Sequence, residues 1–153
     1  TVRVQFLPTT AASFSRTLTV AYTGATVTPA SVSLTGTGVA PTVTFTSESG
    51  AGTLTGTTLN FGNNTTGPYS VTLTISAPVT FGTVVVANTG GSSGGNPTPY
   101  TLGANTCTGS IGPGTCTITV NFNNGNGNTK TGTLTVPYTG GTGSPAVLNL
   151  TGS

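Results

Sequence analysis

The residues that could carry out chemistry in this chain are few. Cys107 and Cys116 are the only cysteines, Asp and Glu together amount to one residue, Lys and Arg to three, and there is no His. A catalytic triad needs a His, and glycoside hydrolysis needs two carboxylates. A structural zinc site needs four Cys or His ligands. The inventory therefore predicts a protein that is not an enzyme and that uses no metal and no cofactor.

Cys107 and Cys116 flank a short segment whose residues 112–114 read Gly-Pro-Gly. A turn at this point would bring the two thiols within disulfide range across a hairpin. A redox or metal-binding pair is the alternative, but further ligands are missing. We therefore expect a structural disulfide, which by loop-closure entropy contributes about 2–3 kcal/mol. It implies an oxidising compartment, and so a secreted or cell-surface protein.

Lys130 and Glu48 raise one covalent alternative. A lysine buried beside an asparagine, with an acid to transfer protons, can form an isopeptide bond. Lys130 lies in a run rich in Gly and Asn, and Glu48 lies in the run Ser-Glu-Ser-Gly. Both side chains are therefore expected in solvent, because burial of an unpaired charge is costly. This expectation argues against the crosslink.

The low charge of the chain bears on its partners. Charged residues make up 3% of the sequence and the net charge is +2, whereas ordinary domains are about 25% charged. Such a chain lacks the basic stripe that nucleic-acid binding needs, and its densest apolar run, 83–87, is too short to span a membrane. Little repulsion keeps copies apart. The expected partner is the chain itself, as a head-to-tail homopolymer.

The apolar residues alternate with polar ones, which is the two-residue period of β-strands, and no segment has a helical period. In the run 117–122, for example, Ile118, Val120 and Phe122 alternate with Thr and Asn. Runs rich in Gly, Asn and Pro separate the expected strands. Seven or more short strands at this spacing predict an all-β protein, an antiparallel immunoglobulin-like β-sandwich.

An internal repeat defines the expected domains. Residues 1–37 align with 117–153 without a gap, at a constant offset of 117 − 1 = 116, which indicates a tandem repeat. Residues 1–38 are therefore expected to be a partial domain holding only the last three strands, near 1–6, 17–23 and 30–36. Residues 39–57 would be a linker or an added strand, and 58–153 a complete sandwich. Identical pairs in the alignment include Phe6/Phe122, Tyr22/Tyr138, Pro29/Pro145 and Leu34/Leu150.

Three strands of one sheet cannot close a two-layer core alone. Either a neighbouring copy or preceding chain must supply the missing strands. Tyr22 and Tyr138, which fall on the apolar phase of their strands, are expected in the core rather than on a sugar-binding surface. The apolar face of the partial repeat, predicted to drive self-assembly, comprises Val2, Val4, Phe6, Leu18, Val20, Tyr22, Val32 and Leu34.

Three sequence elements resemble the choice-of-anchor D and Hydin-like immunoglobulin family. They are the run Leu-Asn-Phe-Gly at 59–62, the two cysteines around the Pro-Gly turn within 105–122, and the closing run Leu-Thr-Gly at 150–152. The resemblance implies repeated extracellular modules on bacterial surfaces, which act as scaffolds or stalks rather than catalysts. It names no ligand.

Two functions follow as hypotheses. The first is a structural subunit of an extracellular filament, which assembles when strands of one copy complete the partial domain of another. The alternative is a spacer or stalk module of a tandem-repeat cell-surface adhesin. A third class, ice or sugar binding, would need a flat threonine face or an exposed aromatic row. Possible N-glycosylation sites in Asn-x-Thr sequons are Asn63, Asn64 and Asn149.

Overall fold

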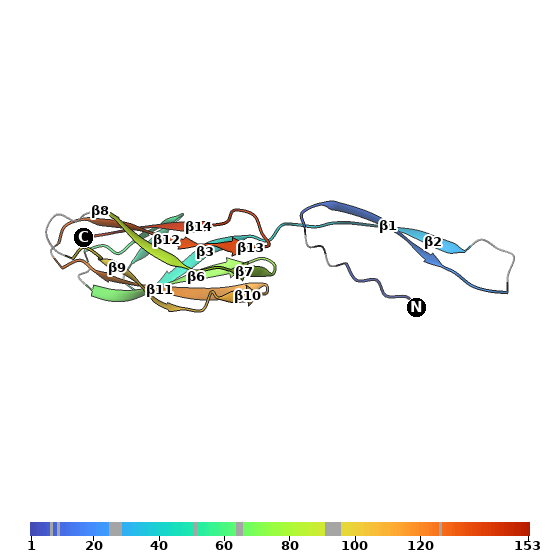
Figure 1. Cartoon of the computed structure of the whole chain (residues 1–153), viewed down its shortest axis with the longest axis horizontal. Helices are drawn as coiled ribbons and strands as arrows, with labels where there is room; N and C mark the ends of the chain where they lie inside the picture. The colour runs from blue at the N-terminus through green and yellow to red at the C-terminus, as the bar shows by residue number, and fades with distance from the viewer. Residues whose placement is uncertain are drawn as a thin grey trace. The chain divides into compact units, whose positions relative to one another are not determined.

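The computed structural model describes the chain except for residues 7, 9, 25–28, 51, 64–65, 91–95 and 126. In the described part every regular element is a β-strand, and none is a helix. The chain divides into two compact units, Thr1–Ala40 and Pro41–Ser153, called unit 1 and unit 2 below (Figure 1). The fold is therefore all-β, as the alternating pattern predicts.

Unit 1 contains one antiparallel hairpin, formed by β1 (Ser13–Val20) and β2 (Ala30–Thr37), in which Leu18 lies opposite Val32. Residues 1–6 form no strand, so the prediction of a strand there is wrong. The reason is the absence of a partner in this unit. The aligned residues 117–122 of unit 2 form a strand that pairs with neighbours on both sides, and neither neighbour has a counterpart among the described residues of unit 1.

The described residues of unit 2 form three sheets. Of its pairings, only that of β14 with β5 is parallel in the described residues. The five-stranded sheet has the order β4 (Thr53–Thr55), β5 (Thr58–Asn60), β14 (Ala146–Gly152), β12 (Lys130–Val136), β8 (Val85–Gly90). The four-stranded sheet has the order β3 (Val43–Ser49), β6 (Thr66–Ile75), β11 (Gly114–Asn123), β9 (Tyr100–Asn105). The small sheet has the order β10 (Gly109–Ile111), β7 (Val79–Phe81), β13 (Tyr138–Thr139).

The segment 39–57, for which the sequence leaves a linker or an added strand open, contains two strands of these sheets. β3 pairs with β6, so that Phe45 lies opposite Leu73. β4 pairs with β5, so that Leu54 lies opposite Leu59. Both Phe45 and Leu54 pack against the core. Residues 43–55 are therefore part of unit 2.

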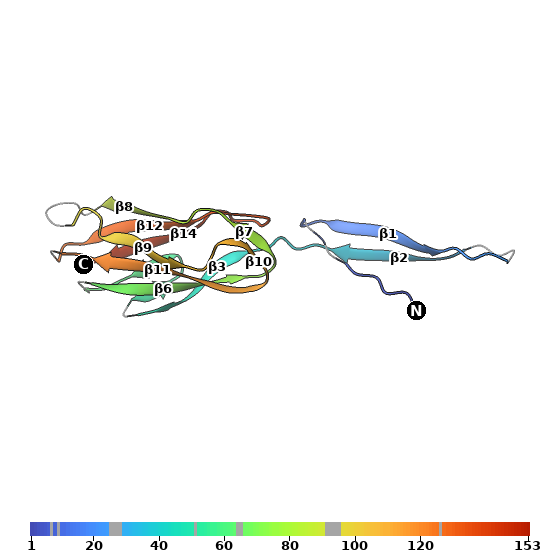
Figure 2. The ribbon, with the colours of Figure 1, turned by 60° about the horizontal axis from the view of Figure 1, so that its bottom comes forward.

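The core of unit 2 lies between the two larger sheets. Leu134 and Leu148 face inward from the five-stranded sheet, Ile118 and Val120 face inward from the four-stranded sheet, and all belong to one buried cluster. Figure 2 shows β8, β12 and β14 in one layer and β6, β9 and β11 in the other. Full burial of each such side chain contributes roughly 1.5–3 kcal/mol of hydrophobic stabilisation. The alternating pattern of each strand thus places one row of residues in this core.

The two aligned tyrosines have different environments. Tyr138 is 4% exposed, as the sequence predicts, whereas Tyr22 is 43% exposed. The prediction of a core position is therefore wrong for Tyr22. Tyr138 lies on β13, which pairs with β7 in the small sheet. The described part of unit 1 has no such sheet.

Among the described residues, no helix has the length and apolar character needed to cross a membrane.

Candidate functional site

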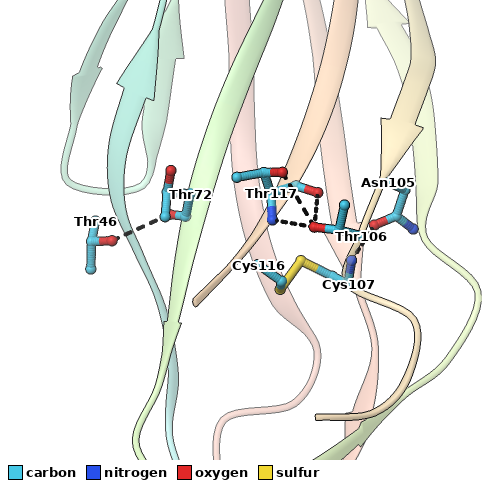
Figure 3. The surroundings of a disulfide bond; sticks show 7 residues. All are labelled: Thr46, Thr72, Asn105, Thr106, Cys107, Cys116 and Thr117. Carbon is cyan, nitrogen blue, oxygen red and sulfur yellow. Dashed lines mark hydrogen bonds between the residues drawn. A yellow bond between two sulfur atoms is a disulfide. The ribbon is translucent and has the colours of Figure 1, made fainter. Parts of the chain in front are cut away.

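The predicted disulfide between Cys107 and Cys116 is confirmed, with the two Cα atoms 5.1 Å apart. It joins the segment after β9 to β11, and both cysteines are buried. Figure 3 shows Asn105 and Thr106 beside the bond. The Cys107 backbone N–H donates to Asn105 Oδ1 at 2.8 Å. Burial and the fixed backbone give this disulfide a structural role.

A threonine pair holds the same junction. The Thr117 N–H donates to Thr106 Oγ1 at 2.8 Å, and that hydroxyl donates to the Thr117 carbonyl at 3.1 Å. Thr106 lies just beyond the end of β9. Its backbone N–H still donates to the Thr117 carbonyl at 2.9 Å, and its side chain adds the two hydrogen bonds above to β11. Threonine suits this position because its hydroxyl both donates and accepts.

Lys130 is fully buried, so the expectation that its side chain is solvated is wrong. It is the first residue of β12, and the alternation of that strand places it on the same inward face as Leu134. The aligned position in unit 1 is Phe14, so the repeat itself marks this position as inward-facing. Glu48, the only acidic residue, lies opposite Val71 on the other large sheet. Glu48 is half-buried there.

Among the described residues of unit 2, Asn124 and Lys130 are the two fully buried polar side chains. Asn124 follows β11, and neither atom of its carboxamide has a hydrogen-bond partner among the described residues. A buried amide without partners costs free energy. The two-residue spacing of Asn124 from Phe122 is the only local pattern that indicates this burial.

Four aromatic residues pack together in the core of unit 2. Phe61 lies 4.5 Å from Tyr69, 5.3 Å from Tyr100 and 5.0 Å from Phe122, measured between ring centroids. Tyr100 stacks on Phe122 at 5.0 Å. Such pairs contribute about 0.5–1.5 kcal/mol each beyond area burial. We call these four residues the aromatic cluster.

Two glycines give the cluster its space. A Cβ added at Gly132 would lie 2.8 Å from the Tyr100 ring, and one added at Gly152 would lie 2.7 Å from the Phe122 ring and 3.0 Å from the Phe61 Cβ. Real Cβ atoms do not approach so closely, so a side chain at either position would displace an aromatic ring.

Asn88 links the two larger sheets beside the cluster. Its Nδ2 donates to the Tyr100 carbonyl at 3.0 Å, and its Oδ1 accepts from the Tyr100 N–H at 2.9 Å. Asn88 lies on β8 and Tyr100 on β9, which are edge strands of different sheets. This link is not predictable from the sequence, because one polar residue within a strand gives no signal of its partner.

Replacing Tyr100 by Phe tests the polar side of the cluster. The Tyr100 hydroxyl donates to the Lys130 carbonyl at 2.9 Å, so its loss should lower the free energy of unfolding by about 1 kcal/mol. Burial raises the pKa of the Tyr100 phenol above its ordinary value of 10.0. The neutral phenol therefore contributes fully below pH 10, and wild-type stability falls as the pH rises above that value.

We expect urea titrations at pH 7 to 11 to show the Tyr100→Phe variant less stable at neutral pH, with the deficit shrinking above pH 10. Tyr22→Phe is the control, because Tyr22 is largely exposed. A pH-independent deficit would contradict the assignment of the alkaline transition to Tyr100.

The predicted self-assembly face of unit 1 is open. Phe6 is 49% exposed and Val4 is 56% exposed, whereas the aligned Phe122 and Val120 of unit 2 are 1% and 0% exposed. Leu18 and Leu34 are half-buried. The other members of this face, Val2, Val20, Tyr22 and Val32, are also among the exposed large hydrophobic residues. The apolar face is therefore uncovered in unit 1 and covered in unit 2.

The hairpin of unit 1 has the same register as β12 and β14 of unit 2. Leu18 lies opposite Val32, and at the constant offset of 116 (134 − 18 = 116) Leu134 lies opposite Leu148. The close approach of a phenylalanine ring to a glycine is also repeated. A Cβ added at Gly36 would lie 2.8 Å from the Phe6 ring, as one at Gly152 would lie 2.7 Å from the Phe122 ring.

A cavity of about 550 Å³ lies on this face, between the N-terminal segment and the hairpin. Its apolar lining includes Val4, Phe6, Phe14 and Leu34, and Arg16 contributes the charged group. The Phe6 and Phe14 rings meet edge to face at 5.7 Å on one side of it. A volume of this size is typical of small-ligand sites.

Two of the three predicted glycosylation sites are exposed. Asn63 is exposed, and its Oδ1 accepts from the Ser153 hydroxyl at 2.6 Å. Asn149 is exposed on β14. Asn64 lies outside the described residues. No group of three metal-ligating side chains occurs in the part of the chain that the structure describes.

Comparisons with known proteins show the fold alone. No protein-family model matches the chain, and no curated protein matches its sequence. The secreted serine protease VesC from Vibrio cholerae matches with a TM-score of 0.50 and 16% identity, over 61% of this chain and 21% of that chain. A protein of unknown function from Porphyromonas gingivalis matches with a TM-score of 0.48 and 10% identity, over 94% of this chain and 66% of that chain. The chain thus shares a β-rich fold with a region of the Vibrio protein.

Proposed function

We propose that this chain is a non-catalytic structural protein of an extracellular filament or surface fibre. In this proposal unit 1 is an incomplete immunoglobulin-like β-sandwich, and strands of a second copy complete it. The open apolar face of unit 1 carries the proposal, because unit 2 buries the aligned residues and unit 1 exposes them. Exposed apolar faces of this kind mark interaction sites.

The repeated register supports the incomplete-domain interpretation. β1 and β2 pair as β12 and β14 do, residue for residue. In unit 2, β12 also pairs with β8, and β14 also pairs with β5. Each strand of the hairpin in unit 1 therefore has one edge that a further strand would fill.

Unit 2 offers edges that could meet those of unit 1. Its two larger sheets end in β3 and β9 and in β4 and β8. Pairing of an edge strand with a second chain is a common mode of β-sheet assembly. A contact between unit 1 of one copy and unit 2 of the next joins two different surfaces, so it does not close on itself and builds a fibre. The 3% charge content offers little repulsion against it.

The disulfide and the fold support an extracellular location. Disulfides persist in oxidising compartments and are rare in the cytosol, and Cys107 and Cys116 form one. The similar region of the Vibrio protease belongs to a secreted protein.

Replacing Val32 by Lys should abolish assembly, because Val32 is 53% exposed on the apolar face of unit 1 and a buried lysine there would be unpaired. Light scattering and sedimentation over a range of concentrations measure the effect. Val147→Lys is the matched control, since Val147 is 39% exposed on β14 in unit 2 and receives the same charge.

We expect the wild-type chain and the Val147→Lys variant to form polymers and the Val32→Lys variant to stay monomeric. A wild-type chain that remains a stable monomer at every concentration would contradict the filament proposal. Equal loss of assembly in both variants would assign the effect to charge rather than to the face of unit 1.

The second candidate function is a spacer or stalk module of a tandem-repeat adhesin. The gapless repeat with an identical hairpin register favours it, because tandem domains of one polypeptide repeat in this way. The missing strands would then come from the same polypeptide. The intact mass of the unreduced polypeptide from its native source separates the two. A mass near 14.9 kDa favours the subunit, and a much larger one favours the array.

A further inference from the structure

We infer that the cavity of unit 1 binds the phenyl ring of an extended Leu-x-Phe-Gly segment, which pairs in parallel with the free edge of β2. The inference rests on the proposed interpretation of unit 1 as an incomplete copy of unit 2. It does not depend on which polypeptide supplies the segment. Unit 2 shows the chemistry of the occupant, because it contains both the equivalent hairpin and the segment that covers it.

In unit 2 the covering segment is Leu59–Gly62. β5 pairs in parallel with β14, so that Leu59 lies opposite Leu150. The Phe61 N–H then donates to the Thr151 carbonyl at 2.7 Å. The Phe61 ring packs on Phe122 at 5.0 Å, and its Cβ lies near Gly152.

Unit 1 contains the counterparts of the β14 residues and of Phe122 in that arrangement. At the offset of 116, Leu150, Thr151 and Gly152 correspond to Leu34, Thr35 and Gly36. The cavity is lined by these three residues, together with Phe6, which corresponds to Phe122. An apolar space thus lies where the Phe61 ring lies in unit 2. A segment in the same parallel register would place Leu against Leu34 and direct Phe into this space.

Gly36 and Arg16 set the selectivity of the cavity. Gly36 is not among the glycines with positive φ, so its role is to leave room rather than to permit a turn. Arg16 stands where unit 2 has Gly132, against which Tyr100 packs closely. Arg16 thus replaces the glycine whose lack of a side chain leaves room for the Tyr100 ring in unit 2. Unit 1 accepts a Phe61-like ring, and Arg16 can interact with the face of an aromatic ring at the cavity.

The chain carries the Leu-x-Phe-Gly pattern once, at 59–62. This segment already pairs with β14, whereas each of the two hairpins requires a segment of its own. Exchange of this segment between copies of residues 1–153 would fill one hairpin only by opening the other. The test below therefore supplies the segment as a separate peptide.

The test uses the full chain and a synthetic peptide of residues 53–63, which reproduces β4, β5 and the Phe-Gly that follows. NMR titration follows the backbone amides of Thr35 and Gly36, with those of Thr151 and Gly152 as internal controls. We expect the first pair to shift and the second pair to stay unchanged, because unit 2 already holds its own segment. A peptide with Phe61→Ala should bind at least about tenfold more weakly.

Two protein variants complete the experiment. Gly36→Val should weaken binding at least about tenfold by filling the cavity, and Thr37→Val, at an exposed position on the same strand, should leave binding unchanged. Absence of binding, or equal affinity of the Phe and Ala peptides, would overturn the inference. The filament proposal fails separately, if the chain stays monomeric, because peptide binding needs no second copy.

Discussion

Replacing Phe122 by Ala is expected to lower the free energy of unfolding of unit 2 by about 3–5 kcal/mol. Phe122 is almost completely buried and packs against both Phe61 and Tyr100 at 5.0 Å. Its removal would leave a cavity that the rigid strands on both sides cannot close. Since domains are stable by only about 5–15 kcal/mol, this loss would bring unit 2 close to unfolding. Urea denaturation followed by tyrosine fluorescence measures it.

The repeat supplies a control for this substitution within the same chain. Phe6 is the residue aligned with Phe122, but it is 49% exposed. Phe6→Ala should therefore change the unfolding of unit 2 by less than about 1 kcal/mol. A small effect of Phe122→Ala would contradict the aromatic cluster as a core element. An effect of Phe6→Ala as large as that of Phe122→Ala would show that the face of unit 1 is covered in solution.

Reduction of the Cys107–Cys116 disulfide should lower the free energy of unfolding by about 2–3 kcal/mol. The cysteines are 9 residues apart in sequence, and closing a loop of this length restricts the unfolded chain by that amount. Reduction adds only two hydrogen atoms, so it perturbs the folded state less than a substitution does. Urea denaturation with and without a reductant, at matched pH, measures the difference.

The double variant Cys107→Ala, Cys116→Ala gives the control for the reductant. Its stability should be lower than that of the oxidised wild-type chain, and a reductant should have no further effect on it. Threonine hydrogen bonds between Thr106 and Thr117 remain in this variant, so we expect it to fold. Equal stability of the oxidised and reduced wild-type chains would contradict a stabilising role for the bond.

Local patterns in the sequence were sufficient for several features of the structure. Alternation of apolar and polar residues predicted strands such as β11 and β12, because a strand buried on one face needs only this period. The Gly-Pro-Gly turn predicted the disulfide, because it limits the distance between Cys107 and Cys116. The constant offset between the two repeats agrees with the shared register of the β1–β2 and β12–β14 pairs.

Other features depend on residues that are far apart in the sequence. The parallel pairing of β5 with β14 brings Phe61 onto Phe122, and no local pattern specifies which strands become neighbours. Burial of Lys130 is decided by the strand and sheet around it, although a charged residue in a polar run indicates a solvated turn. The link from Asn88 to Tyr100 likewise joins edges of two sheets.

The sequence by itself determined that the protein is all-β, disulfide-bonded, nearly uncharged and internally repeated. Only the tertiary structure decided that the same pattern gives a covered face in unit 2 and an open one in unit 1. The physical reason is that a strand is stable only with partners for its backbone groups and a layer over its apolar face. Residues 117–122 have both and form a strand, whereas residues 1–6 form no strand.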